Sequence, residues 1–157
     1  MKAAVFVRSA SSLVKEVARH LLRRPVVGVA AAARTADGRW LLIRRGDSGS
    51  WALAGGTLEW GETLEKTLVR ELREEAGVER VVLERLVGVY SNPDRDPRFH
   101  AVTVVASVII DPPTLSPANP LEILEVRLFS RDELPKELSH GMTVMLEDAL
   151  EGKTRLE

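Results

Sequence analysis

The segment from residue 56 to residue 78 constrains the fold more than any other part of this sequence, because it specifies one helix together with both of its ends. A tryptophan–glycine pair predicts a turn just before the helix. Glu62 or Thr63 is expected to begin the helix, by capping its first amide groups or by favouring the positive end of its dipole. Gly77 is expected to end it, because glycine readily adopts the left-handed conformation of a helix cap.

The expected helix carries an apolar stripe and an acidic group side by side. Its leucines recur every four residues, at Leu64, Leu68 and Leu72. Glu71, Glu74 and Glu75 have the spacing i, i+3 and i+4, so they project from one face beside the leucines. Their mutual repulsion is removed by a hard divalent cation such as Mg²⁺ or Mn²⁺, which prefers oxygen ligands. Arg70 can orient Glu74 through a charged pair, and a solvated glutamate–arginine face is the alternative interpretation.

The complete segment has a more specific pattern than its glutamates alone. It reads glycine, five residues, glutamate, seven residues, then Arg-Glu-aliphatic-x-Glu-Glu-x-Gly-aliphatic. At every defined position this resembles the signature of the Nudix hydrolase family, and weaker resemblance extends on both sides of the segment. The resemblance implies an enzyme in which water attacks phosphorus, with divalent metal, and cleaves a nucleoside diphosphate from another linked group.

The resemblance also implies a role for individual residues. Glu71, Glu74 and Glu75 match the family's metal ligands. Gly55, just before the segment, matches a position whose backbone carbonyl often joins the metal shell. The chemistry requires metal because pyrophosphate is anionic and repels an attacking hydroxide until its oxygens are neutralised. The pair that orients the carboxylates in this family is matched by Glu62 and Arg70.

Basic residues on both sides of the segment are candidates for substrate binding. Arg44 and Arg45 follow a predicted strand at a place where the family commonly has basic residues, which are expected to face nucleotide phosphates. The loop at residues 91–100 resembles an arginine-rich segment of ADP-ribose pyrophosphatases and related nucleoside-diphosphate-sugar hydrolases. Arg95 and Arg98 of this loop are therefore expected to bind pyrophosphate or ribose oxygens. Exposed strand-end arginines and a salt-bridged surface turn are the alternatives.

A further acidic residue is expected near the last strand. In this family a fourth acidic ligand, or a base, often comes from that region. Glu122 lies at the better-matching position, and Glu125 is the second candidate. An exposed strand-end carboxylate is the alternative for either residue.

Apolar runs and helical spacing predict the remaining elements. Strands are expected at residues 26–33, 40–43, 80–90, 101–110 and 122–129. Further helices are expected at residues 11–24, 130–135 and 142–150. This order matches the α/β/α sandwich with a mixed central sheet that the resemblance implies. At 157 residues the chain is most simply one domain over residues 1–157, with residues 1–24 as a helical extension.

Composition excludes several other classes of protein. Apolar residues make up 45% of the chain, which is ample for a buried core, and the absence of cysteine excludes disulfides and thiolate metal sites. A net charge of −1 argues against nucleic acid and anionic membranes as partners. No apolar run reaches membrane-spanning length and none has the pattern of a signal peptide, so a cytoplasmic enzyme is expected. Family members often form dimers, and a homodimer stays open here.

The resemblance thus predicts a metal-dependent pyrophosphohydrolase with a nucleotide substrate. The arginine-rich loop favours ADP-ribose or a nucleoside diphosphate sugar. The alternatives are a nucleoside triphosphate pyrophosphohydrolase that removes oxidised nucleotides and an enzyme that acts on RNA ends. A non-catalytic nucleotide sensor is disfavoured, because none of the acidic residues of the segment is missing.

Overall fold

The computed structural model describes residues 24–157, so the helix expected at residues 11–24 lies outside them but for Arg24. The strands are β1 (Val26–Thr35), β2 (Trp40–Arg45), β3 (Trp51–Ala52), β4 (Ala54–Thr57), β5 (Val81–Tyr90), β6 (Ala101–Ile110), β7 (Ile123–Phe129) and β8 (Arg155–Leu156). The helices are α2 (Leu64–Ala76), α3 (Met142–Leu150) and the short 3₁₀ helices η1 (Arg131–Glu133) and η2 (Ser139–Gly141). The predicted strands are confirmed within two residues at each end. Three short strands, β3, β4 and β8, were not predicted.

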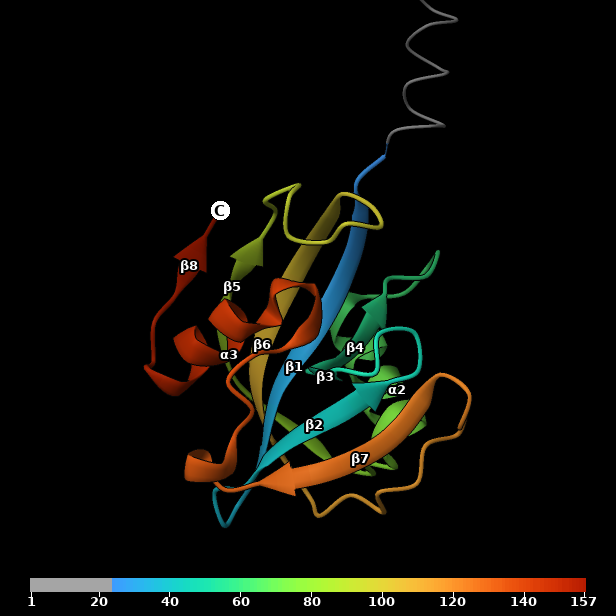
Figure 1. The fold of residues 1–157 in the computed structure, drawn as a ribbon, viewed down its shortest axis with the longest axis vertical. Helices are drawn as coiled ribbons and strands as arrows, with labels where there is room; N and C mark the ends of the chain where they lie inside the picture. Colours follow the sequence, from blue (N-terminus) through green and yellow to red (C-terminus); the bar gives the residue numbers. More distant parts are fainter. Residues whose placement is uncertain (1–23) are drawn as a thin grey trace, which may run out of the picture.

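One mixed sheet of eight strands runs through the described residues (Figure 1). Its centre is the parallel pair β1–β6, in register from Val26 with Ala101 to Thr35 with Ile110. The other edge of β1 is shared by β4 and β2, both antiparallel to it. β2 continues to β7, and β6 continues to β5 and then to the parallel strand β8. The expected mixed sheet is confirmed.

The two long helices cover opposite faces of this sheet (Figure 1). Alternate residues of a strand point to opposite faces, so β1 contributes to two separate cores. Val29, Ala31 and Ala33 pack in the core that includes α2, and Ala30 and Ala32 pack in the core that includes α3. The α/β/α sandwich expected from the sequence is therefore confirmed.

The helix α2 begins and ends where its sequence predicts. The hydroxyl of Thr63 accepts a hydrogen bond from the amide of Lys66, and Gly77 ends the helix with a φ of 66°. Leu68 and Leu72 are buried, but Leu64 is 38% exposed, so the apolar stripe starts one turn later than predicted. In the first turns of α2 the residue that faces inward is Thr67. It is fully buried, and its hydroxyl donates a hydrogen bond to Glu62.

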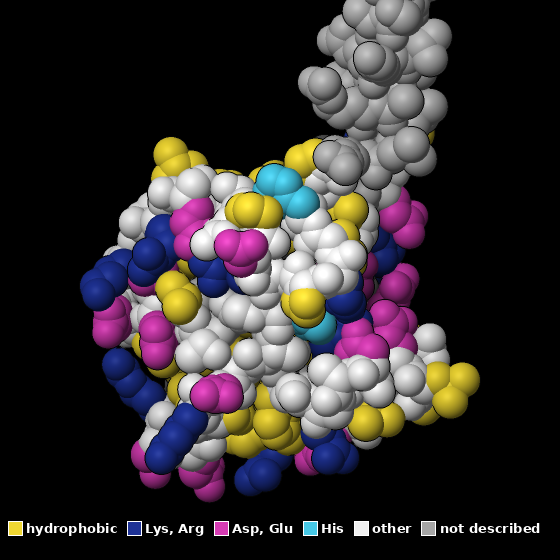
Figure 2. Space-filling view, turned by 45° about the horizontal axis from the view of Figure 1, so that its top comes forward, with side chains coloured by type: hydrophobic (Ala, Val, Ile, Leu, Met, Phe, Trp, Pro, Cys, Tyr) yellow, Lys and Arg dark blue, Asp and Glu magenta, His cyan; other side chains and the backbone are white. Residues whose placement is uncertain are grey.

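Acidic and basic side chains are intermixed on the face seen in Figure 2. Within residues 24–157, no helix combines the length and apolarity needed to cross a membrane.

Candidate functional site

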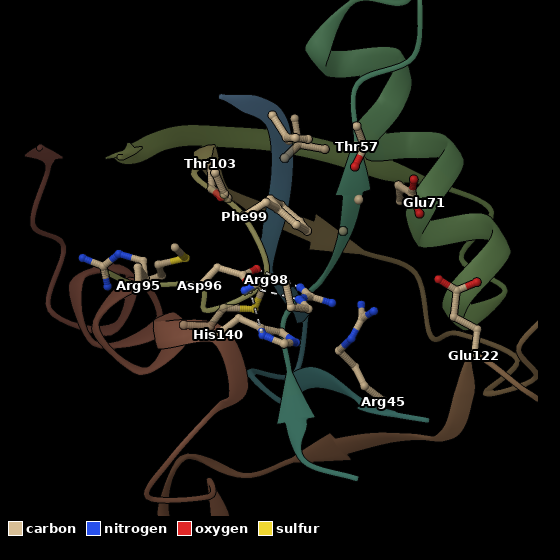
Figure 3. Close-up of a pocket in the computed structure, with 18 of the residues that line it drawn as sticks. Arg45, Thr57, Glu71, Arg95, Asp96, Arg98, Phe99, Thr103, Glu122 and His140 are labelled. Carbon is tan, nitrogen blue, oxygen red and sulfur yellow. Dashed lines mark hydrogen bonds and ion pairs between the residues drawn. The ribbon is translucent and has the colours of Figure 1, made fainter. Parts of the chain in front are cut away.

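A cleft of about 560 Å³ lies where β1, β4 and α2 meet the loop at residues 91–100 and the turn at residues 139–142. This volume is within the range of small-molecule sites. Glu71 and Glu122 line the cleft from one side, and Arg98 and His140 line it from the other, with Arg45 between them (Figure 3). Gly55 also lines the cleft. The structure therefore brings residues that are far apart in the sequence around one space.

Arg70 connects the carboxylates of the acidic helix. Its guanidinium donates to both carboxylate oxygens of Glu62, with Nε–Oε1 at 2.9 Å and Nη2–Oε2 at 3.0 Å. Its Nη1 donates to Glu71 at 2.9 Å and to Glu74 at 3.4 Å. The hydrogen bonds from Arg70 and then from Thr67 lower the pKa of Glu62 to about 2. This geometry supports an orienting role for the Glu62–Arg70 pair.

Glu75 differs from its neighbours because it points into the protein. Only 6% of it is exposed, and its Oε2 accepts a hydrogen bond from the amide of Gly55 at 2.7 Å. Burial raises the pKa of Glu75 to about 8, the hydrogen bond from Gly55 opposes that rise, and the charges of Glu71 and Glu122 add to it. A cation beside Glu75 would favour its charged form.

Glu71 lies at the mouth of the cleft against the backbone of β4. A Cβ atom added to Gly56 would lie 2.2 Å from its Oε1, so the glycine provides the space that this carboxylate fills. Burial raises the pKa of Glu71, the charge of Arg70 opposes that rise, and the charges of Glu74 and Glu122 add to it. Like charges at this wall and an all-oxygen donor set fit a hard divalent cation.

The acidic side chains are nevertheless not already arranged around a common point. Among residues 24–157, no three histidine or acidic side chains converge as metal ligands. The reason is visible in their partners: Glu75 turns to the amide of Gly55, while Glu74, whose side chain is 54% exposed, turns to Arg70. Side-chain rotation of these two residues would be needed for Glu71, Glu74 and Glu75 to share one ion.

Glu122 and Glu125 occupy different environments, which separates the two candidates. Glu122 lines the cleft, and its charge acts on both Glu71 and Glu75. Glu125 is paired with Arg44 across β7 and β2, with Nε–Oε2 at 3.3 Å. The structure thus places Glu122, and not Glu125, beside the acidic helix.

The expected substrate arginines fall into two groups. Arg45 and Arg98 line the cleft, and Asp47 joins them: it accepts from Arg45 at 3.1 and 3.2 Å and from Arg98 at 2.8 Å. Asp96 accepts two further bonds from Arg98, at 3.0 and 2.8 Å. The hydrogen bonds and charge of Arg45, with the charge of Arg98, lower the pKa of Asp47 to about 2.

The other two arginines are committed elsewhere. Arg44 does not line the cleft, because its guanidinium pairs with Glu125. Arg95 lines the cleft with its side chain, but its Nη1 donates to the carbonyl of Gly141 at 2.9 Å and its Nη2 pairs with Glu157. Figure 3 shows its guanidinium pointing away from Arg98 and the acidic wall.

The cleft residues that were not predicted include His140 and Phe99. His140 lies in the left-handed region at φ 54°, which is unusual for a residue other than glycine, and its Nε2 is buried without a hydrogen-bond partner. Burial and the charge of Arg98 lower its pKa, against the opposing charge of Asp96. Phe99 is 41% exposed and lies under the guanidinium of Arg98, 5.1 Å from it. A lone histidine or phenylalanine in a loop carries no spacing that reveals such a role.

The fold and the cleft together define a class of protein: an α/β/α sandwich whose cleft has an arginine-linked acidic helix on one side and paired arginines on the other. The chain belongs to the Nudix family, because the family model described as NUDIX domain matches residues 23–149. Nudix hydrolases generally depend on a divalent metal ion.

Relatives of this chain carry different names, among them ADP-ribose pyrophosphatase, MutT-like protein and nucleoside triphosphatase. It is 40% identical over 103 residues to an ADP-ribose pyrophosphatase of Methanocaldococcus jannaschii, a match that covers 64% of this chain and 59% of that protein. It is 37% identical over 127 residues to a MutT-like protein of Streptomyces ambofaciens, covering 80% of this chain and 77% of that one. A solved ADP-ribose pyrophosphatase from Streptococcus suis superposes with a TM-score of 0.70 at 27% identity, covering 85% of this chain and 100% of that one.

Proposed function

We propose that this chain is a divalent-metal-dependent pyrophosphohydrolase that cleaves a nucleoside diphosphate from a linked group, with ADP-ribose or a nucleoside diphosphate sugar as substrate. The observation that carries the proposal is the division of one cleft into an acidic wall with Glu71 and Glu122 and a basic wall with Arg45 and Arg98. A pyrophosphate suits this division, because its charge needs a cation on one side and guanidinium groups on the other.

We assign the metal to the acidic wall. Glu71, Glu74 and Glu75 would hold Mg²⁺ or Mn²⁺ together with the carbonyl of Gly55, and Arg70 with Glu62 would orient the carboxylates. The raised pKa values of Glu71 and Glu75 support this assignment, since crowded and buried carboxylates favour a nearby cation. When bound, the ion would neutralise the pyrophosphate oxygens and lower the pKa of the attacking water.

Other residues around the cleft would accept a proton and bind the phosphate oxygens. The oxygen of water forms a bond to one phosphorus, and the bond from that phosphorus to the bridging oxygen breaks. Glu122 lines the same wall of the cleft as Glu71 and is the proposed acceptor of the proton that the water loses. Arg45 and Arg98 would bind the phosphate oxygens, and the two products leave as a nucleoside monophosphate and a sugar phosphate.

The choice of substrate is supported by the basic wall and by the named relatives. Phe99 presents an exposed ring with the guanidinium of Arg98 over it, a surface on which a nucleobase can stack. Two of the similar proteins described above are named ADP-ribose pyrophosphatases. A nucleotide with a second phosphorylated group would contact both walls at once.

The decisive experiment is a hydrolysis panel with the full chain and Mg²⁺. It would contain ADP-ribose, nucleoside diphosphate sugars, dinucleoside polyphosphates and ordinary and oxidised nucleoside triphosphates, with the products separated. We expect AMP and a sugar phosphate from ADP-ribose, no turnover in EDTA, and a loss of activity of about 100-fold or more in Glu71→Gln. Release of pyrophosphate from triphosphates alone would replace the proposal by the nucleoside triphosphate alternative.

A further inference from the structure

Residues 155–157 are bound to the loop that carries Arg98 of the basic wall. β8 lies beside β5, with Arg155 opposite Gly88 and Leu156 opposite Val89 (Figure 1). A Cβ atom at Gly88 would lie 2.4 Å from the carbonyl oxygen of Arg155, so the glycine allows this close approach. β5 leads directly into residues 91–100, and β8 therefore ends beside the start of that loop.

A buried polar group anchors β8 to the sandwich. Asp148 of α3 is 3% exposed and accepts hydrogen bonds from Arg155 at 2.5 and 3.1 Å and from the hydroxyl of Tyr90 at 2.9 Å. A buried carboxylate that is paired in this way is costly to separate from its partners. The position of β8 is thus fixed independently of the loop.

Glu157 extends from this anchor and makes four contacts with β5 and the loop. Its amide donates to the carbonyl of Val89 at 3.0 Å, and its carbonyl accepts from the hydroxyl of Ser91 at 2.8 Å. Its carboxylate accepts from the amide of Asn92 at 3.2 Å through Oε2 and pairs with Arg95 through Oε1. Both side chains of the Glu157–Arg95 pair are partly exposed, at 22% and 15%.

Arg95 links Glu157 to residues beside the cleft. Its guanidinium stacks 5.4 Å from the centre of the Tyr90 ring and donates to the carbonyl of Gly141. Gly141 follows His140, which lines the cleft, and Arg95 itself precedes Asp96 and Arg98 of the basic wall. One guanidinium thus joins β8, the loop and the turn at residues 139–141.

We propose that Glu157 is a positioning residue, which acts through Arg95 to hold the loop at residues 91–100 and the turn at residues 139–141 in the geometry that binds substrate. The role in substrate binding rests on the proposed function, whereas the hold on the loop does not. Arg95 accordingly serves as the connector between β8 and the cleft, and Arg98 makes the contact with phosphate.

The test compares Glu157→Gln with Glu151→Gln in the full chain. Glu151 is a matched control, because it is also an acidic residue after α3 but pairs with the exposed Lys153. Hydrogen exchange without substrate would report on the amides of residues 92–96, where Asn92 donates to Glu157. We expect faster exchange there in Glu157→Gln, unchanged exchange in Glu151→Gln, and unchanged exchange in both variants at β1 and β6.

Kinetics with ADP-ribose and Mg²⁺ test the effect on the cleft. We expect Glu157→Gln to raise KM by about twofold to fivefold, the size expected for one partly exposed ion pair, with kcat nearly unchanged. The charge-swapped pair Arg95→Glu with Glu157→Arg should restore part of both the exchange protection and the KM.

Two results would overturn the proposal. Exchange at residues 92–96 that is the same in Glu157→Gln and the native chain would show that Glu157 does not hold the loop. Faster exchange with an unchanged KM would show that the hold has no part in substrate binding. If the native chain hydrolysed none of the substrates, the proposed function would fail, and the exchange result alone would decide whether Glu157 holds the loop.

Discussion

At the scale of single residues, Arg70 keeps neighbouring carboxylates in different electrostatic states. Glu62 receives two of its hydrogen bonds and has a lowered pKa, while Glu71 receives one and has a raised pKa, because burial and nearby negative charge outweigh that bond. Glu62 is thus held in its charged form, whereas a cation beside Glu71 would favour the charged form of Glu71.

The first prediction concerns the acidic wall. Glu71→Gln should lower kcat/KM by about 100-fold or more, because it removes charge that supports the proposed metal ion. Arg70→Ala should cost less, about 10- to 100-fold, since it acts through the orientation of the carboxylates. Steady-state hydrolysis of ADP-ribose at saturating Mg²⁺ measures both. Glu65→Gln in the first turn of α2 is the control, and near-native activity of Glu71→Gln would contradict the assignment.

A second prediction follows from the space beside Gly56. In Gly56→Ala the new methyl group would meet Glu71 at 2.2 Å, and the flexible glutamate would move away while the backbone stays. We expect a folded protein with Tm within a few degrees of the native value and a large loss of kcat. Adding Gly56→Ala to Glu71→Gln should cost little more, and a full additive loss would show that the glycine acts independently of Glu71.

At the scale of elements, local sequence determines the acidic helix, whereas the ion pairs of the basic wall join residues from separate turns. The helix α2 carries its capping residues, apolar spacing and glutamates in one continuous segment, so its sequence predicted its bounds and its acidic face. Asp47, Asp96 and His140 come from three different turns, and only the folded sheet brings them together. Local spacing contains no information about such distant partners, and the same holds for the pairing of Arg95 with Glu157.

The stability contributed by Asp47, which pairs with Arg98 of the loop at residues 91–100, should depend on pH. The pKa of Asp47 is lowered to about 2 in the folded chain, so its contribution to stability is present above its ordinary value near 3.8 and is lost as the pH falls toward 2. Asp47→Asn should therefore lower Tm at pH 6 and make progressively less difference below pH 4. Because the side chain of Asp47 is 41% exposed, the effect should stay below about 1 kcal/mol.

Thermal unfolding of both proteins across this pH range measures the effect. Asp94→Asn, an exposed substitution in the same loop as Arg98, is the control. A difference between Asp47→Asn and the native chain that stayed constant from pH 6 to pH 3 would contradict the ion-pair explanation.

At the scale of the whole molecule, the sequence predicted the sandwich but not all of its edges. Long apolar runs predicted β1 and β6, because buried strands need them. The two-residue strands β3 and β8 are too short for any periodicity, and they exist because neighbouring strands offer free backbone groups. The prediction that Leu64 belongs to the buried apolar stripe was wrong for a related reason. Helical spacing shows which residues share a face, but not at which residue that face begins to pack against the sheet.

Metal binding should be visible in the stability of the whole chain. An ion that binds only the folded state raises Tm, by an amount equivalent to about 2.7 kcal/mol at 100 times its dissociation constant. We expect Mg²⁺ to raise Tm of the native chain, EDTA to reverse the rise, and Glu71→Gln to show a much smaller rise. An equal response of Glu71→Gln to Mg²⁺ would place the ion elsewhere.

The parallel pairing of β1 with β6 has a consequence for how the chain reaches this structure. Val26 pairs with Ala101 and Thr35 with Ile110, so the central strand pair closes a loop that contains the whole acidic helix. The antiparallel β5–β6 pair is more local in sequence. Closing a long loop is entropically costly and slow, whereas local pairs form early. We therefore expect β5 and β6 to associate first, and the two walls of the cleft to meet only in the final, rate-limiting closure onto β1.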